Sequence, residues 1–233
     1  MMASSSRPGP FVRADTSPWT GYLDLGIRRS FNANLVLLHP GDRLEFLYYV
    51  QSGEILTTHF ASPEDSHRIS ITGENAVAGI FELFSPLPPK TSWRTLRPTV
   101  CYLFSRECVE RDLPRHLLLN LLEQSAFMGI SLAGRFARGL DKKNDARLAR
   151  FLLHFAESCP VKEEGGVITI LPIVTQELSS ELLGMHQVTF NKILAAFRSR
   201  GIIGKSKISG LQILDIRALA AIADGNSFPD GAG

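Results

Sequence analysis

The sequence lacks most of the features that reveal a function at first sight. Its 233 residues include only three cysteines, Cys101, Cys108 and Cys159, and their spacing does not suit a metal site. No apolar run approaches the ~20 residues that a membrane-spanning helix needs. The N-terminal stretch has no apolar core like that of a secretory signal. We therefore expect a cytoplasmic protein with reduced thiols and no membrane segment.

Charge and catalytic motifs are equally sparse. The formal net charge is only +2, so any signal for nucleic-acid binding has to come from the local distribution of charge. The sequence has no recognisable nucleophile–base pair, no zinc-site spacing and no glycine-rich phosphate-binding loop. These absences argue against an enzyme.

Composition and apolar patterning divide the chain into regions. Residues 1–20 and 225–233 are rich in Ser, Pro and Gly and are predicted to be flexible tails. Short apolar runs fill residues 21–109, and a helical period follows over 110–143 and 144–224. This order predicts an α+β protein with an N-terminal β-domain, a long central helix and a C-terminal domain.

The N-terminal β-domain is indicated by five short runs that are separated by turn residues. The runs are residues 35–38, 46–50, 55–58, 68–71 and 100–104. Such spacing is typical of an antiparallel β-roll or sandwich. The segment 85–89 contains three prolines and is excluded as a central strand, because proline cannot donate a ladder hydrogen bond.

The central helix carries an apolar stripe at three- and four-residue steps. Because a helix of this length exceeds what the core of a small domain can cover, we interpret the stripe as the seam of a parallel dimer. The alternative is a helix that lies on its own β-domain. The predicted dimerisation residues are Leu118, Leu122, Ser125, Gly129, Leu132 and Phe136.

The most specific local pattern lies in residues 175–201. Thr175 can cap a short helix, and Gly184 permits a tight turn after it. A second helix is expected to follow. Its predicted apolar positions are Val188, Ile193, Leu194 and Phe197. Two short helices joined by a glycine-containing turn form a helix-turn-helix, which can place its second helix in the major groove of DNA.

A basic hairpin follows the second helix. Residues 201–215 place β-branched residues on both sides of a turn that contains Lys205 and Lys207, which is typical of a wing. Between His186 and Arg217 the sequence has six lysines and arginines and a single acid. This local excess of positive charge suits phosphate contacts.

These segments resemble a known family. The stretch TQELSSELLGMHQVTFNKILAAFRSRGIIGKSKISGLQILD resembles the winged helix of the Crp/Fnr superfamily of bacterial transcription regulators, and HPGDRLEFLYYVQSGEI is similar to its cyclic-nucleotide-binding-like β-roll. The resemblance covers roughly residues 22–223. It implies a homodimer that binds double-stranded DNA, is controlled by a small molecule in the β-roll and, if it is an activator, contacts RNA polymerase.

The residues expected at the effector site depart from the family pattern. Nucleotide-binding members hold the ribose with a Gly-Glu pair and the cyclic phosphate with an Arg; this sequence has Ile80 and Lys90 at those two places. A lysine ammonium binds an anion as a point charge, whereas an arginine guanidinium can donate two parallel hydrogen bonds to it. We therefore expect a small organic effector, such as a carboxylate or phenolate, and not cyclic AMP. The expected effector-binding residues are Gly79, Ile80, Phe81, Glu82, Lys90, Thr91, Ser125 and Ser131.

The identity of the effector stays open at this point. Haem, with His39, His59 or His67 as a ligand, is a less favoured alternative, because turn and surface histidines usually have no such role. A bound metal is not expected, since the iron–sulphur members of the family use N-terminal cysteines that this sequence lacks.

The recognition helix also departs from the family. Many members present an Arg-Glu pair and a second Arg that read G·C pairs, whereas this sequence has Gln187, Val188 and Lys192. The series 185–190 is most similar to the regulators of organohalide respiration, whose ligands are halogenated phenols. Glutamine and valine favour an A/T-rich operator. The expected DNA-binding residues are Thr175, Gln176, His186, Gln187, Val188, Thr189, Lys192, Lys205 and Lys207.

One hypothesis from another functional class stands beside the DNA-binding regulator. It is a ligand-binding scaffold whose winged helix mediates protein contacts, and a DNA-binding experiment separates the two.

Overall fold

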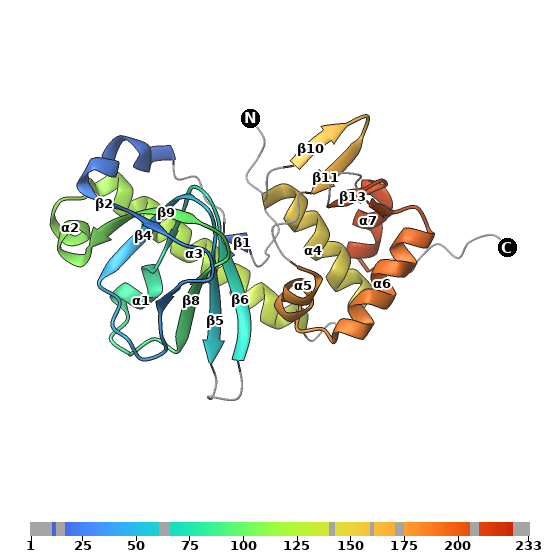
Figure 1. Cartoon of the computed structure of the whole chain (residues 1–233), viewed down its shortest axis with the longest axis horizontal. Helices are drawn as coiled ribbons and strands as arrows, with labels where there is room; N and C mark the ends of the chain where they lie inside the picture. Colours follow the sequence, from blue (N-terminus) through green and yellow to red (C-terminus); the bar gives the residue numbers. More distant parts are fainter. Residues whose placement is uncertain are drawn as a thin grey trace. The chain divides into compact units, whose positions relative to one another are not determined.

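The computed structural model in Figure 1 describes residues 11–12, 17–60, 66–139, 143–158, 161–170, 175–205 and 210–225. The chain divides into two compact units. Among the described residues, the first unit ends at Leu132 and the second begins at Ala133.

The first unit contains two sheets, with strand orders β1-β6-β5-β8-β3 and β2-β9-β4-β7. All pairs are antiparallel except β1 with β6. The strands are β1 (Phe11–Val12), β2 (Ile27–Phe31), β3 (Val36–Leu38), β4 (Phe46–Ser52), β5 (Ile55–Phe60), β6 (Ser66–Thr72), β7 (Ala76–Ala78), β8 (Thr91–Thr95) and β9 (Thr99–Ser105). The predicted antiparallel β-roll is confirmed. The pattern missed four strands: β1 and β7 have only two and three residues, and polar residues interrupt β2 and β8.

Two hydrophobic cores stabilise the roll. The inter-sheet core consists of Leu38, Tyr48, Val50, Ile55, Ala78, Trp93, Cys101 and Leu103. The helix-side core consists of Trp19, Leu47, Tyr49, Val77, Ile80, Leu83, Phe104, Cys108, Val109, Leu113, Leu117 and Leu121. Strand β4 contributes to both cores, because successive side chains of a strand point to opposite faces. This double burial explains why β4 reads as a continuous apolar run.

Four helical segments accompany the sheets. They are η1 (Ser17–Leu25), α1 (Ile80–Phe84), α2 (Arg106–Arg111) and α3 (Arg115–Gly139). Trp19 in η1 is fully buried, and its indole Nε1 donates to Asn120 Oδ1 of α3 at 2.9 Å. The predicted tail over residues 1–20 is therefore wrong at its end, since a proline- and serine-rich composition concealed a large aromatic anchor.

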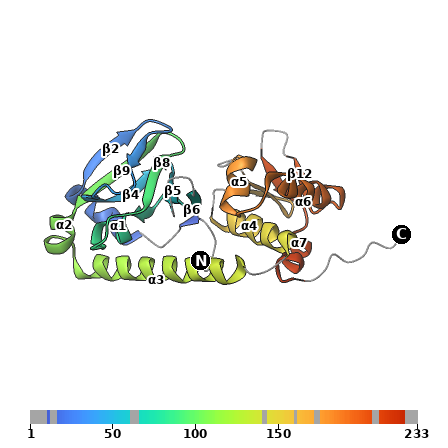
Figure 2. The same ribbon diagram turned by 90° about the horizontal axis from the view of Figure 1, so that it is seen from below.

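Helix α3 has a buried face and an exposed face. Figure 2 shows it running beneath the sheets of its unit. Leu117 and Leu121 lie in the helix-side core, so one face does lie on its own β-domain. On the other face, Leu119, Leu122 and Ile130 are exposed. The helix therefore does lie on its own β-domain through one face, and the dimer interpretation of the other face stays a prediction.

In its described residues, the second unit combines four helices with a sheet of strand order β10-β11-β13-β12. Its elements are α4 (Asn144–Ser158), β10 (Val161–Glu164), β11 (Val167–Ile170), α5 (Gln176–Leu182), α6 (Gln187–Ser199), β12 (Ile203–Lys205), β13 (Leu211–Ile213) and α7 (Ile216–Ala223). Helix α4 packs against α6 and α7. Two helices, a turn and a β-hairpin in this order confirm the winged helix-turn-helix. Strands β10 and β11 were not predicted.

The two cysteines among the described residues are buried and free. Burial raises the pKa of the Cys101 thiol to about 12 and also raises the pKa of Cys108. Both thiols therefore stay protonated and unreactive near neutral pH. Cys159 lies outside the described residues. None of the described helices combines the length and the apolar character that crossing a bilayer requires.

Candidate nucleic-acid interface and effector site

The helix-turn-helix is fixed by local hydrogen bonds. The Thr175 side chain caps α5 by accepting a bond from the Leu178 amide at 3.1 Å, as predicted. Gly184 has φ of 56°, a left-handed conformation that a side chain disfavours. His186 caps α6, with its Nδ1 accepting from the Val188 amide at 3.3 Å. The start of the second helix is therefore set by the histidine itself.

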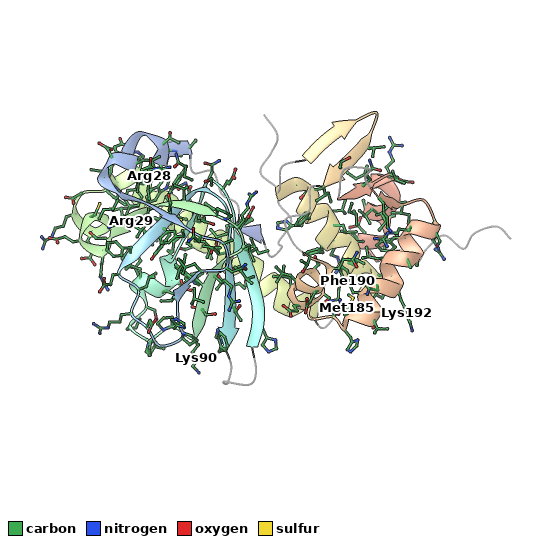
Figure 3. The ribbon with its side chains drawn as sticks, viewed as in Figure 1. Arg28, Arg29, Lys90, Met185, Phe190 and Lys192 are labelled. Carbon is green, nitrogen blue, oxygen red and sulfur yellow. The ribbon has the colours of Figure 1, made fainter. Side chains whose placement is uncertain are left out.

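Helix α6 has one apolar face and one solvent face. Phe190, Leu194 and Phe197 are buried and hold the helix on its unit. Val188, predicted as an apolar anchor as well as a reader, is 56% exposed, and Phe190 takes the anchoring position. Gln187 and Lys192 are also exposed, and Figure 3 shows Lys192 extending away from the unit.

The remaining predicted DNA-contacting residues lie around this helix. Gln176 is exposed at the start of α5, and Thr189 is half-buried on α6. Lys205 is exposed at the end of β12, which pairs with β13 to form the predicted wing. Lys207 lies outside the described residues.

The loop that enters α1 carries the predicted effector residues. Gly79 is buried with φ of 99°, and a Cβ atom there would lie 2.7 Å from Leu44 Cδ2. Ile80 packs into the helix-side core, so it could not be exchanged for an acid without burying a charge. Phe81 is 42% exposed.

The structure brings Glu82 and Thr91 together. The Thr91 hydroxyl donates to Glu82 Oε1 at 3.1 Å. Burial raises the pKa of the Glu82 carboxyl, and the neighbouring Thr91 hydroxyl and Trp93 indole partly oppose this shift. The indole Nε1 is buried but does not reach hydrogen-bond geometry with any described atom. Among the described residues, no lysine or arginine forms an ion pair with Glu82.

Two predicted effector residues, Lys90 and Ser125, do not join this pair. Lys90 is exposed, and Figure 3 shows its side chain at the outer end of the roll. Ser125 is half-buried on α3, and its hydroxyl donates to the Leu121 carbonyl of the same helix at 2.8 Å. The side chain of Ser131 is not described. The anion contact expected of Lys90 stays a prediction.

The stripe predicted for dimerisation is divided between the two faces of α3. Leu122 is 65% exposed and Gly129 is exposed, but Leu118 packs against the helix-side core of its own unit. Leu132 is half-buried. Phe136 belongs to α3, but its side chain is not described.

Metal and haem ligands were sought among the same residues. The described part of the chain contains no group of three or more His, Cys, Asp or Glu side chains that could hold a metal ion. His59 and His67 lie opposite each other on β5 and β6, and His39 lies at an exposed turn. These positions add no support for haem.

Comparison with known proteins matches both units. Residues 28–116 match the cyclic nucleotide-binding domain, and residues 146–222 match the Crp-like helix-turn-helix domain. The chain is 30% identical over 177 residues to the CRP-like cAMP-activated global transcriptional regulator of Mycobacterium tuberculosis (strain CDC 1551 / Oshkosh), which covers 72% of this chain and 75% of that protein. The chain belongs to the Crp/Fnr family of transcription regulators.

Solved structures of Crp/Fnr regulators share the fold. FixK2 from Bradyrhizobium japonicum superimposes with a TM-score of 0.72 at 15% identity, covering 89% of this chain and 99% of that one. CprK complexed with OCPA gives a TM-score of 0.65 at 18% identity, covering 93% of this chain and 99% of that one. At these identities the likeness is one of fold. Because Crp-like helix-turn-helix regulators bind DNA, α5 and α6 form the DNA-binding element of this member of the family.

Sequence reasoning missed several residues of these sites. Asn191 is exposed one helical turn after Gln187, and helical spacing alone places it on the same face. Leu119 and Ile130 belong to the exposed face of α3. The position of Trp93 beside Glu82 depends on strand pairing that no local pattern shows.

Proposed function

We propose that this Crp/Fnr regulator acts in the bacterial cytoplasm and binds an inverted-repeat operator as a homodimer, with an effector in the β-roll controlling the two recognition helices. If it activates transcription, RNA polymerase is a further partner. The proposal rests on the two different faces of α6. Buried side chains anchor one face to the unit, and the other presents Gln187, Val188 and Lys192 to solvent.

The solvent face of α6 favours A·T pairs. Gln187 can pair with adenine N6 and N7, and the methyl groups of Val188 can pack on the thymine C5-methyl. Lys192 reaches a guanine or a phosphate. The residues proposed to contact the DNA backbone are Thr175, Gln176, His186, Thr189, Lys205 and Lys207. These contacts contribute affinity without sequence preference.

Selection from a random duplex library tests this proposal. The purified full chain, with and without candidate effectors, is expected to enrich an A/T-rich inverted repeat whose half-sites lie about one helical turn, roughly 10 base pairs, apart. Recovery of no enriched sequence would contradict the DNA-binding proposal and favour the scaffold hypothesis.

The homodimer is proposed to form along the exposed face of α3. Leu122, Gly129 and Leu132 of the predicted stripe remain in this proposal, together with the exposed Leu119 and Ile130. Exposed apolar side chains repeated along one helix face are typical of an interface that a second copy covers. The small Gly129 permits close approach of the two helices.

The effector is proposed to be a small organic molecule that binds beside α1. It would meet the carboxyl group of Glu82 and the hydroxyl of Thr91. Among the described residues no lysine or arginine forms an ion pair with Glu82, and Arg106 donates instead to the Leu83 carbonyl of α1 at 3.3 Å. A neutral or cationic molecule fits these groups better than the carboxylate or phenolate suggested by Lys90.

Calorimetry tests whether the effector is instead a cyclic nucleotide, as it is for the cAMP-activated relative of Mycobacterium tuberculosis. Cyclic AMP and cyclic GMP are expected to show no tight binding, because Ile80 offers no acceptor for a ribose hydroxyl and Lys90 extends outward. A micromolar dissociation constant for either nucleotide would contradict the expectation.

A further inference from the structure

Helix α4 supplies cations to the C-terminal ends of two other helices. The Arg147 guanidinium donates through Nη2 to the carbonyl of Leu183, the C-cap residue that directly follows α5, and through Nη1 to Asn144 Oδ1 at 3.2 Å. The Arg150 guanidinium donates through Nε to the carbonyl of Ala223, the last residue of α7, at 2.6 Å. A cation is favoured at such an end because the unpaired carbonyls give it partial negative charge.

The bond from Arg147 falls on the turn that joins α5 to the recognition helix. Within the turn, the Gly184 amide donates to Glu181 O and the Met185 amide donates to Ser180 O, both at 2.9 Å. A Cβ atom added to Gly184 would lie 3.8 Å from Arg147 Nη2, so the guanidinium lies directly against the turn. The turn is therefore held from outside as well as from within.

The buried side chains of α5 are Ser179, Ser180 and Leu182, so two of the three are polar. The hydroxyls of Ser179 and Ser180 donate to Thr175 O and Glu177 O of their own segment, at 2.8 and 2.7 Å. These bonds fix α5 to nothing else. Serines also bury little apolar area compared with a leucine. A charge-assisted bond from α4 consequently carries more weight here than in a helix with a full apolar face.

We propose that Arg147 is a positioning residue for DNA recognition. Its bond to Leu183 fixes the turn between α5 and α6 and so sets the angle at which α6 presents its readers. Loss of the bond should lower the ratio of the affinities for operator and other DNA while the protein remains folded. This proposal rests on the proposed DNA-binding function.

Arg150 provides a matched control for the test. Arg147→Ala and Arg150→Ala each remove one guanidinium from α4 and one bond to the end of a helix, but only α5 adjoins the recognition helix. Operator and scrambled duplexes are titrated with each variant at one salt concentration. Arg147→Ala is expected to lower the ratio of the two affinities about tenfold, as loss of a bond from a charged group implies, while Arg150→Ala leaves the ratio unchanged.

Two further measurements cover the case in which Arg147→Ala folds poorly. Arg147→Lys keeps the charge but cannot donate in two directions from a planar group, so an intermediate ratio is expected. Amide hydrogen exchange at Gly184, Met185 and Val188 should accelerate in both Arg147 variants and not in Arg150→Ala. Equal discrimination and equal exchange in Arg147→Ala and the wild type would overturn the role of Arg147 alone. A wild type that selects no duplex would overturn the DNA-binding function, and this role with it.

Discussion

Helices α6 and α1, which are proposed to contact the two ligands, are built differently. The 13 residues of α6 separate anchoring side chains from exposed ones, and its cap comes from the His186 side chain. The five residues of α1 begin after Gly79 with no side-chain cap, and two of them, Ile80 and Leu83, belong to the helix-side core. The exposed side chains of α6 that are proposed to contact bases can therefore be substituted with little effect on folding. Substitutions in α1 beside the proposed effector, by contrast, also disturb the hydrophobic core.

The largest expected effect comes from removing an anchor of α6. Phe197 is fully buried, and Phe197→Ala should destabilise the second unit by ~3–5 kcal/mol. Both tryptophans, Trp19 and Trp93, lie in the first unit, so their fluorescence reports on the roll while far-UV circular dichroism reports on both units. In urea, the variant should lose dichroism early without a matching change in fluorescence. Simultaneous shifts of both signals would show that the units do not unfold independently.

The next effect concerns the face of α3 that neither ligand touches. Because Leu122 is 65% exposed, Leu122→Asp should leave each protomer folded. In a homodimer the substitution removes one leucine from each protomer. Because each buried leucine contributes ~1.5–3 kcal/mol, the loss of both should weaken dimerisation about a hundredfold or more. Sedimentation should show monomers, and operator binding should be lost. Exchange of the exposed Asp24, which lies on η1 and outside α3, for alanine is the control. A Leu122→Asp variant that remains a dimer would place the seam elsewhere.

A smaller effect tests the independence of the α6 readers directly. Replacing Gln187 and Val188 by the family's Arg-Glu pair should redirect binding toward G·C-containing half-sites, at ~1–3 kcal/mol per changed base pair. Because both positions are exposed, the free energy of unfolding should change by no more than ~0.5 kcal/mol. Retention of the wild-type base preference would mean that this face of α6 is not the reader.

The smallest effect concerns Glu82 beside α1. Its raised pKa means that the folded state binds the proton more tightly than the unfolded state, so stability falls as pH rises above the usual glutamate value of about 4.3. Glu82→Gln keeps an oxygen acceptor for Thr91 but cannot ionise. Its free energy of unfolding relative to the wild type should therefore increase from pH 4 upward and then level off. Parallel pH profiles would show that the Glu82 carboxyl is not coupled to folding.

The sequence predicted the elements whose signals are local. Thr175 and Gly184 marked the ends of a short helix and its turn, and dense apolar runs marked β4 and β9. Strands β2 and β8 were missed because polar residues interrupt them. The predicted stripe on α3 did not show which residues pack on the β-roll, since periodicity shows that a stripe exists but not which partner covers each of its residues.

The effector residues were harder to predict for a physical reason. Lys90 and Thr91 are adjacent in the sequence, yet β8 buries Thr91 and leaves Lys90 outside. Glu82 reaches Thr91 through the pairing of distant strands and the position of α1, which no local spacing encodes. The family resemblance pointed to this loop, but it gave no sign that Thr91 pairs with Glu82 while Lys90 is exposed.

The double burial of β4 also constrains how this protein can evolve. Leu47 and Tyr49 fill one core while Tyr48 and Val50 fill the other, so no position in this stretch is free to drift. A slip of the strand by a single residue would exchange the contents of the two cores. The exposed face of α6 has no such constraint. New operators should therefore be acquired faster in this lineage than new effectors, and a saturation mutagenesis library should be depleted more at Leu47, Tyr48, Tyr49 and Val50 than at Gln187 or Val188.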